Sequence, residues 1–520
     1  MKKTYLILCA LFITAGLNAQ YVFHKMIKQT GISGYLYRTI QLSDEGYAAA
    51  GFLTNQELFN DDFFIAKFNS EGDKEWIKSL SSPDSDEFSD LIEASDGGLI
   101  AVGTTLSFDN FMTHAVIQKF NSDGSKAWCK SYTVTGKSTR AKGIQKDNEG
   151  NLYVLGIIEL AGFTYDYFVM KLDANGTILQ QASIGTSNSE FALSFLRKDN
   201  GDLFIGGWGN DGTGESIQVV KLNSSLTVQW GKIISGSIKY FGYDIKEKSN
   251  GNLVIGGRLD DQTTSYDALI LELNHSTGDV VWAKQYSANN GLPIYAYGLA
   301  VNTGDRIGIA GIIEDINSGT LVFETDANGI VNWSKRINSV NEISSLAYGI
   351  CSTEDEGYVV CGPRTGIDSS VMQILKVAMT GYALCFNTNY PLTVTNLTLA
   401  SQNLTFTSAV SNIVAQDDDF GETVYNEIKD ACFHTNTNEF LPSTGMLVFP
   451  NPSEGQFSLT LPDLRSGCGI VLTDAAGRSY YQKENLLDKT IDFDLDLMPG
   501  IYFIRLSSDE GNFVSKLLIR

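Results

Sequence analysis

The sequence predicts an all-β protein: a seven-bladed β-propeller followed by a linker and a small C-terminal β-sandwich. Three observations carry this prediction. A tryptophan-bearing motif returns every 51 or 52 residues, seven apolar runs each end in glycine, and the composition changes after residue 386. The chain has 520 residues, of which 50 are glycine, and glycine-rich turns between aromatic and β-branched runs are typical of β structure.

The repeat is clearest at one position, which holds tryptophan in five copies and leucine in two: Trp76, Trp128, Leu179, Trp230, Trp282, Trp333 and Leu384. Trp128 follows Trp76 by 128 − 76 = 52 residues, and Trp333 follows Trp282 by 333 − 282 = 51. Periods of ~40–50 residues mark stacked copies of one unit, such as propeller blades. We expect these side chains to be buried between blades. Trp208 falls outside the position, and we expect it in a loop.

Each copy contains four extended runs separated by turn residues. The second run is densely apolar and ends in glycine, the third often ends in lysine, as in Phe63–Lys67, and the fourth carries the tryptophan. The glycines that end the second runs are Gly51, Gly103, Gly156, Gly207, Gly257, Gly311 and Gly362. Four antiparallel strands build one propeller blade, so seven such runs predict seven blades.

The closure of the ring has two candidate solutions. Phe23 lies 76 − 23 = 53 residues before Trp76, so it occupies the tryptophan position of a fourth run that has no blade of its own. This segment is expected to complete the blade of the last copy and so join the two ends of the ring. In the alternative, Leu384 supplies that strand and residues 21–27 add an edge strand.

The repeats resemble those of bacterial extracellular β-propeller proteins, written roughly D-x-F-V-x-K-x-[DN]-x-x-G-x-x-x-W, from about Phe23 to Phe386. Asp62, Asp166 and Asp267 stand at the aspartate of that motif, whereas Glu324 replaces the lysine in the sixth copy. The resemblance implies a fold and leaves the activity open.

The C-terminal residues carry several spaced motifs of turns and strand ends: Pro450, Asn451 and Pro452 with Gly455, Asp474 with Gly477 and Arg478, Pro499, Gly500 and Tyr502, and finally Lys516. These residues resemble the type A C-terminal sorting domain of the type IX secretion system of Bacteroidota. The resemblance implies Sec export, passage across the outer membrane with the secretion machinery as partner, and a protein that is secreted or held at the cell surface.

The remaining segments complete the domain plan. Residues 1–19 read as a signal peptide, 20–386 as the propeller, 387–441 as a Thr- and Asn-rich linker or small β element, and 442–520 as the sorting domain. In an oxidising compartment Cys385 and Cys432 are expected to close the linker with a disulfide, and a cross-strand pair of Cys351 and Cys361 is possible.

Charge and motifs narrow the function. The formal net charge is −22 without a basic patch, which argues against nucleic acid as a partner, and no apolar run is long enough for a transmembrane segment. The four histidines lie far apart, and there is no C-x-x-C, so we expect no metal site, no cofactor and no recognisable catalytic residue.

The function expected from these features is binding or display of a glycan, peptide or matrix component at a loop-rich face of the ring. The alternative is an extracellular hydrolase that acts on polysaccharide or peptide. Two carboxylates about 5–10 Å apart in the central funnel would favour the hydrolase. An aromatic-lined face with few carboxylates would favour binding.

Overall fold

The computed structural model of the protein describes residues 21–27, 32–55, 60–109, 112–160, 164–210, 214–261, 266–316, 318–337, 342–366, 370–383, 387–409, 411–418, 420–424, 428–430, 447–449, 453, 455–460, 469–474, 478–483, 490–495, 497–508 and 511–519. The expected signal peptide lies outside these residues. The chain forms two compact units, Met1–Phe433 and His434–Arg520. No helix of the described residues is long and apolar enough to cross a membrane.

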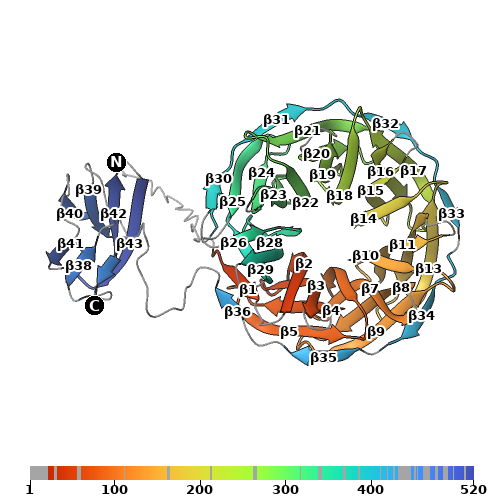
Figure 1. The fold of residues 1–520 in the computed structure, drawn as a ribbon, viewed down its shortest axis with the longest axis horizontal. Coiled ribbons are helices and arrows are strands. Elements are labelled where there is room, and N and C mark those ends of the chain that lie inside the picture. Colours follow the sequence, from red (N-terminus) through yellow and green to blue (C-terminus); the bar gives the residue numbers. More distant parts are fainter. Residues whose placement is uncertain are drawn as a thin grey trace, which may run out of the picture. The chain divides into compact units, whose positions relative to one another are not determined.

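The first unit is a ring of seven antiparallel sheets (Figure 1), which confirms the predicted seven-bladed propeller. Blade 1 comprises β2 (Ile32–Gln41), β3 (Tyr47–Asn55), β4 (Asn60–Phe68) and β5 (Lys74–Ser81). Blade 2 comprises β6 (Asp86–Glu93), β7 (Leu99–Asp109), β8 (Met112–Phe120) and β9 (Lys126–Thr133). Blade 3 comprises β10 (Thr139–Lys146), β11 (Leu152–Glu159), β12 (Tyr165–Leu172) and β13 (Ile178–Gly185).

The later blades repeat this order, with the first strand of each innermost in the ring. Blade 4 comprises β14 (Glu190–Arg197), β15 (Leu203–Asn210), β16 (Glu215–Leu222) and β17 (Val228–Ser235). Blade 5 comprises β18 (Lys239–Glu247), β19 (Leu253–Asp260), β20 (Tyr266–Leu273) and β21 (Val280–Ala288). Blade 6 comprises β22 (Ile294–Val301), β23 (Ile307–Ile313), β24 (Gly319–Thr325) and β25 (Val331–Ile337).

Blade 7 closes the ring with strands from both ends of the propeller. The last repeat supplies β26 (Glu342–Ser345), β27 (Gly349–Ser352), β28 (Tyr358–Gly366) and β29 (Ser370–Val377). The N-terminal strand β1 (His24–Ile27) pairs antiparallel with β29. This confirms the closure in which the N-terminal segment supplies the fourth strand. Leu384, which the alternative closure places in that fourth strand, lies outside the described residues.

The glycine and tryptophan of the repeat pack on each other from one blade to the next. Gly124, in the turn between the third and fourth strands of blade 2, has a φ of 80°, and a Cβ there would lie 2.7 Å from the ring of Trp76 in blade 1. Gly72 has the same relation to Phe23, again at 2.7 Å, so Phe23 does occupy the tryptophan position. The tryptophans are half-buried and pack against the cores between blades, as Trp76 and Trp128 do. In blade 3 the strand register places Gln180, not Leu179, opposite Lys171, which is the place that Trp76 and Trp128 hold opposite Lys67 and Lys119. The expected role of Leu179 as a buried substitute for tryptophan was therefore wrong, and its side chain is exposed.

The lysine that ends the third run forms an ion pair within its own blade. In blade 1 the Nζ atom of Lys67 lies 2.7 Å from a carboxylate oxygen of Asp44, in the turn between the first and second strands. Blade 6 has the charges exchanged, with Arg306 in that turn and Glu324 on the third strand, 3.2 Å apart. The departure of Glu324 from the repeat motif therefore preserves the ion pair.

The segment 387–441 was expected to be a linker or a small β element, and its described residues, within 387–430, form seven short strands around the ring. We call this segment the belt. It adds one short outer strand to each blade, in reverse blade order from blade 6 to blade 1 and then blade 7: β30 (Asn387–Asn389), β31 (Leu392–Asn396), β32 (Ala400–Asn403), β33 (Thr407–Ala409), β34 (Val414–Asp417), β35 (Gly421–Val424) and β36 (Ile428–Asp430). Figure 1 shows these strands as a circle around the blades. The belt covers the seven sheet edges that would otherwise stay unpaired.

Apolar side chains fasten the belt at intervals of seven residues. They are Leu392, Leu399, Phe406, Ile413 and Phe420. Each packs into a different core between two blades. The belt passes from one blade to the next in about seven residues, since each of its strands pairs with a different blade. The spacing of apolar residues in the belt therefore matches the ring.

The second unit is a small β-sandwich, as predicted. One sheet holds β37 (Leu447–Phe449), β38 (Gln456–Thr460) and β41 (Thr490–Asp494). The other holds β40 (Ser479–Lys483), β39 (Gly469–Asp474), β42 (Gly500–Ser508) and β43 (Gly511–Ile519). Alternate residues of both sheets, such as Phe457, Leu472 and Ile504, meet in one apolar core.

Candidate functional site

The innermost strand of every blade carries an irregularity at the same place. In blades 1 to 6 one residue has no partner on the second strand, and in blade 7 the equivalent residue lies between β26 and β27. These residues are Tyr37, Ser89, Lys142, Leu193, Tyr243, Tyr297 and Tyr348. A β-bulge re-aims its side chain, and here all seven point at the central channel.

The glycines that end the second runs exist because of these bulges. A Cβ on Gly51 would lie 1.9 Å from the carbonyl oxygen of Tyr35, two residues before the bulged Tyr37. A Cβ on Gly257 would lie 1.9 Å from the carbonyl oxygen of Phe241, two residues before Tyr243. The bulge thus pushes a backbone carbonyl onto the neighbouring strand, where only glycine fits.

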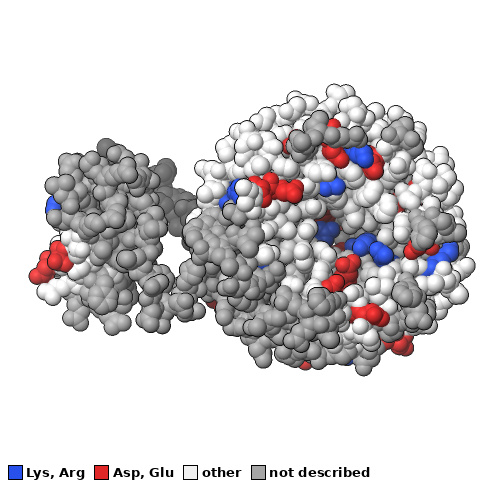
Figure 2. Space-filling view, viewed as in Figure 1, with Lys and Arg blue, Asp and Glu red and all other residues white. Residues whose placement is uncertain are grey.

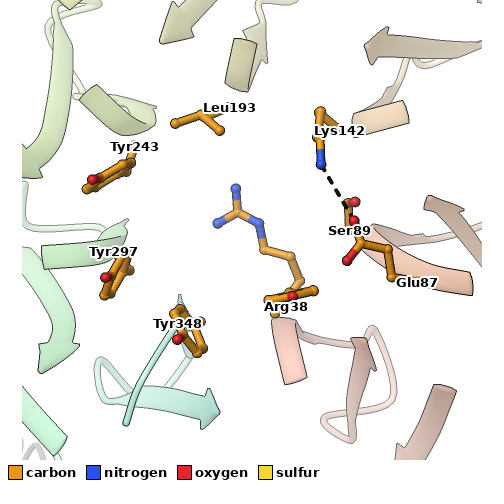
Figure 3. A pocket seen from close by; sticks show the side chains of 9 residues that line it. Arg38, Glu87, Ser89, Lys142, Leu193, Tyr243, Tyr297 and Tyr348 are labelled. Carbon is orange, nitrogen blue, oxygen red and sulfur yellow. Dashed lines mark ion pairs between the residues drawn. The ribbon is translucent and has the colours of Figure 1, made fainter. Parts of the chain in front are cut away.

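The seven bulged residues line an open cavity of about 220 Å³ together with Arg38 and Glu87. We call it the cup. Figure 3 shows three tyrosines on one side, Lys142 and Glu87 on the other, and the guanidinium of Arg38 between them. In Figure 2 the centre of the ring is hollowed, and basic and acidic side chains lie on its wall.

A layer of charged side chains forms the floor of the cup. Arg38 of blade 1 reaches across the channel to blade 5, where its Nη1 atom donates a hydrogen bond to Asp244 at 2.9 Å. Its Nε atom lies 3.7 Å from a carboxylate oxygen of Asp90 in blade 2. Below this floor lies a second cavity of about 220 Å³, whose lining also includes Arg38. The floor therefore divides the channel in two.

Asp244 is the best-satisfied group of the floor. It accepts hydrogen bonds from the hydroxyl of Ser194 at 2.6 Å, the backbone N–H of Ile245 at 2.9 Å and the ammonium of Lys246 at 2.7 Å. Burial alone would raise the pKa of Asp244, but the charges of Arg38 and Lys246 outweigh it and hold that pKa well below its usual range. Asp244 is therefore an ionised structural group.

Lys142 is the least-satisfied cation of the cup. Glu87 is the single carboxylate among the described residues that lies within 4 Å of its Nζ atom, and at 3.7 Å the contact is long. Burial lowers the pKa of Lys142, and the attraction of Glu87 offsets this only in part. The ammonium projects into the cup (Figure 3).

Aromatic side chains of six blades, including four that line the cup, contact one another in a series with a single interruption. The series, which we call the aromatic arc, runs from blade 3 through blades 4, 5, 6 and 7 to blade 1: Tyr165, Phe191, Trp208, Phe241, Tyr243, Tyr266, Tyr295, Tyr297, Tyr348, Tyr35, Tyr37 and Phe52. Neighbouring ring centroids lie 4.4 to 6.1 Å apart. Eleven of the rings are half-buried, so part of each remains accessible.

Arg258 bridges the one interval of the arc without a ring-to-ring contact. Its guanidinium carbon lies 4.7 Å from the ring centroids of both Phe241 and Tyr266, and 5.4 Å from that of Tyr295. Such cation–π contacts fix the rings relative to one another. Trp208 belongs to the arc and lies on β15, stacked on Phe191, so its expected place in a loop was wrong.

The predicted sorting residues lie on turns and strands of the second unit where they are described. Asp474 accepts a hydrogen bond from the Nε atom of Arg478 at 2.7 Å, and the hydroxyl of Tyr502 donates to the backbone of Met498. Gly455 has a φ of 103°, Pro499 directly precedes β42, Gly500 is its first residue, and Lys516 lies on β43 opposite Phe503. Pro450, Asn451, Pro452 and Gly477 lie outside the described residues.

The cysteines give no disulfide among the described residues. Cys351 and Cys361 are both free, and the strand register places them opposite Val359 and Gly349 rather than opposite each other. Cys385 and Cys432 lie outside the described residues, so their disulfide stays a prediction. No cluster of three potential metal ligands occurs among the described residues.

Comparisons with known proteins add one assignment. Residues 447–520 match the model of the secretion system C-terminal sorting domain. No curated protein matches the chain. Among solved structures, an ulvan lyase of polysaccharide lyase family PL25, bound to -[GlcA(1-4)Rha3S]-, is 10% identical with a TM-score of 0.43, over 68% of this chain and 91% of that one. A protein of unknown function from Dyadobacter fermentans is 10% identical with a TM-score of 0.41, over 68% and 98%.

The similarities to solved structures are too low to bear on activity. The sorting domain is informative, because it marks proteins that the type IX system exports. The chain thus carries a type IX C-terminal sorting domain, and it is an exported protein of the cell surface or the surrounding medium.

Proposed function

We propose that this exported propeller binds carbohydrate, and that the ligand lies along the aromatic arc with one part in the cup. The observation that carries the proposal is the arc itself: twelve rings that contact one another directly or through Arg258, eleven of them half-buried and four of them in the lining of the cup. Aromatic faces stack on the C–H faces of sugar rings, and tyrosine adds a hydroxyl that can bond to sugar hydroxyls.

The surroundings of the arc favour sugar over an apolar partner. The part of the arc at the cup consists of tyrosines. Tyr37, Tyr243, Tyr297 and Tyr348 line the cup, and Tyr35 and Tyr295 contact them. A surface that combines flat apolar faces with many hydroxyl groups suits a ligand of the same mixed character. The size of the cup supports an extended ligand, because about 220 Å³ is smaller than the ~300–1,000 Å³ of sites that enclose a drug-sized molecule.

The carboxylates of the channel favour binding over hydrolysis. Glu87 is the one carboxylate in the described lining of the cup. Asp244 is held by Arg38 and Lys246, and Asp90 accepts hydrogen bonds from the backbone N–H groups of Leu91 and Ile144. A hydrolase of the two-carboxylate type needs an acid and a base that are both open to the substrate. Hydrolysis of polysaccharide or peptide remains the alternative.

A glycan array with the purified full chain tests the proposal. We expect binding that falls about tenfold or more in Tyr297→Ala, since the loss of a stacking contact of about 1.4 kcal/mol is a factor of ten. Tyr382→Ala is the matched control, because Tyr382 is 54% exposed and lies outside the arc. Thermal melts establish that both variants are folded.

Two results would contradict the proposal. One is an array on which no carbohydrate binds the folded chain. The other is binding that Tyr297→Ala and Tyr382→Ala weaken equally. Release of new reducing ends from a bound polysaccharide would favour the hydrolase instead.

A further inference from the structure

The cup is asymmetric in charge. Its tyrosines lie on blades 1, 5, 6 and 7, whereas Glu87 and Lys142 lie opposite them, on blades 2 and 3. The chain as a whole is strongly acidic, with a net charge of −22. Within this acidic chain, the half-buried Lys142 has only one carboxylate nearby among the described residues, and it lines the cup across from the tyrosines.

Building on the proposed carbohydrate binding, we propose that the ligand is an acidic sugar. Its anionic substituent, a carboxylate or a sulfate, enters the cup and binds between the ammonium of Lys142 and the guanidinium of Arg38. This assigns the aromatic arc to the sugar rings and the cup to the charged group.

Lys142 has the unmet bonding capacity that such a ligand needs. The ammonium has three donors, and its one carboxylate partner among the described residues is Glu87 at 3.7 Å. Its side chain is 21% exposed, so water satisfies it only in part. Burial lowers the pKa of Lys142, which means that the site gains from a second negative charge.

Arg38 offers a second donor on the same side of the channel. Its Nη1 atom bonds to Asp244 and its Nε atom faces Asp90, so among the described residues the Nη2 atom has no partner. The guanidinium lies in the middle of the cup in Figure 3. Because the floor holds Arg38 in place, this donor is oriented before the ligand arrives.

The fit of size is consistent with one charged ring. The cup, at about 220 Å³, lies below the ~300–1,000 Å³ of sites that enclose a drug-sized ligand, so it suits one ring rather than a whole oligosaccharide. The remaining units of an oligosaccharide would then lie outside the cup, on the arc. The anionic substituent therefore belongs to a residue that can reach the channel, such as a chain end.

Matched pairs of ligands separate charge from shape. Calorimetric titration of the full chain would use oligogalacturonate against its methyl ester, and a sulfated galactose oligosaccharide against its desulfated form. We expect the anionic member of at least one pair to bind about tenfold or more tightly than its neutral counterpart, since a charge-assisted hydrogen bond contributes about that much. The two pairs distinguish carboxylate from sulfate.

Variants of one strand locate the charge. In Lys142→Met, the anionic and the neutral member of each pair are expected to bind with about the same affinity. Lys142→Arg keeps the positive charge and is expected to keep the preference for the anionic member. Lys146→Met is the matched control, because Lys146 ends the same strand, is exposed and lies outside the cup. Thermal melts confirm that each variant is folded.

The outcomes are distinct for the two proposals. Equal binding of both members in both pairs, or a preference that Lys142→Met leaves unchanged, overturns the acidic-sugar proposal. Neutral glycans that bind through Tyr297 while both anionic probes fail overturn it as well, and leave carbohydrate binding intact. Failure of every glycan, neutral and anionic, removes both proposals together.

Discussion

Removal of Arg38 should destabilise the propeller, because this side chain spans the channel from blade 1 to blade 5. Arg38→Met deletes the hydrogen bond to Asp244 at 2.9 Å and the contact with Asp90 at 3.7 Å, and leaves Asp244, whose side chain is 1% exposed, with one charge partner fewer. Breaking a buried ion pair costs about 3–5 kcal/mol. Since Lys246 and Ser194 still bond to Asp244, we expect the lower end, about 3 kcal/mol.

A double-mutant cycle isolates the interaction. Asp244→Asn removes the charge that Arg38 balances, so the variant with both changes should lose less stability than the sum of the two single losses, by about 1–3 kcal/mol. Urea unfolding followed by tryptophan fluorescence is the assay, because all six tryptophans precede residue 434 and therefore report on the propeller unit alone. Strictly additive losses, or a loss below about 1 kcal/mol for Arg38→Met, would refute the argument.

Three further predictions concern the belt, a buried acid and export. Phe406→Ala should lower the free energy of unfolding, measured in urea, by about 3–5 kcal/mol, because Phe406 is buried. Val414→Ala should lower it by less than about 1 kcal/mol, because Val414 is 60% exposed. Equal losses in the two variants would show that the belt does not stabilise the propeller through its buried side chains. Burial raises the pKa of Glu190 from 4.5 to about 7, so stability should fall as pH rises through that window, and Glu190→Gln should flatten the slope in melts from pH 4 to 8; an unchanged slope contradicts this. Deletion of residues 446–520 should leave a folded propeller in the periplasm by cell fractionation, and normal surface levels would contradict this.

The architecture of the propeller could be predicted because its signals repeat. The glycine at the end of each second strand recurs because a bulged neighbour lies too close for a side chain. The aromatic position, held by five tryptophans and Phe23, recurs because a turn glycine of the adjacent blade packs on the ring. The belt was missed because its signal has another period. Leu392, Leu399 and Phe406 are spaced by seven residues within a Thr- and Asn-rich segment, and a search at the blade period does not find them.

The tryptophan position shows a limit of the same method. The period predicted burial between blades, and the five tryptophans do pack against the cores there, although each is only half-buried. The period assigned Leu179 to the same position, but the strand register gives that position to Gln180, one residue later, and leaves Leu179 exposed. Trp208 was assigned to a loop because it falls outside the period. It lies on a strand and joins Phe191 and Phe241 in the aromatic arc.

The cup could have been located from the sequence by combining the period with one geometric rule. Each bulged residue precedes the glycine that accommodates it by 14 positions, as in 51 − 37 = 14 for Tyr37 and 156 − 142 = 14 for Lys142, and the same holds for Tyr348 and Gly362. The glycine is constant because the backbone requires it. The bulged residue varies because nothing in the fold fixes its side chain, and it is tyrosine in four blades but lysine in one. In a ring of repeats, the positions that carry the fold are those that recur, and the position that faces the ligand is the one at fixed register whose residue changes from blade to blade.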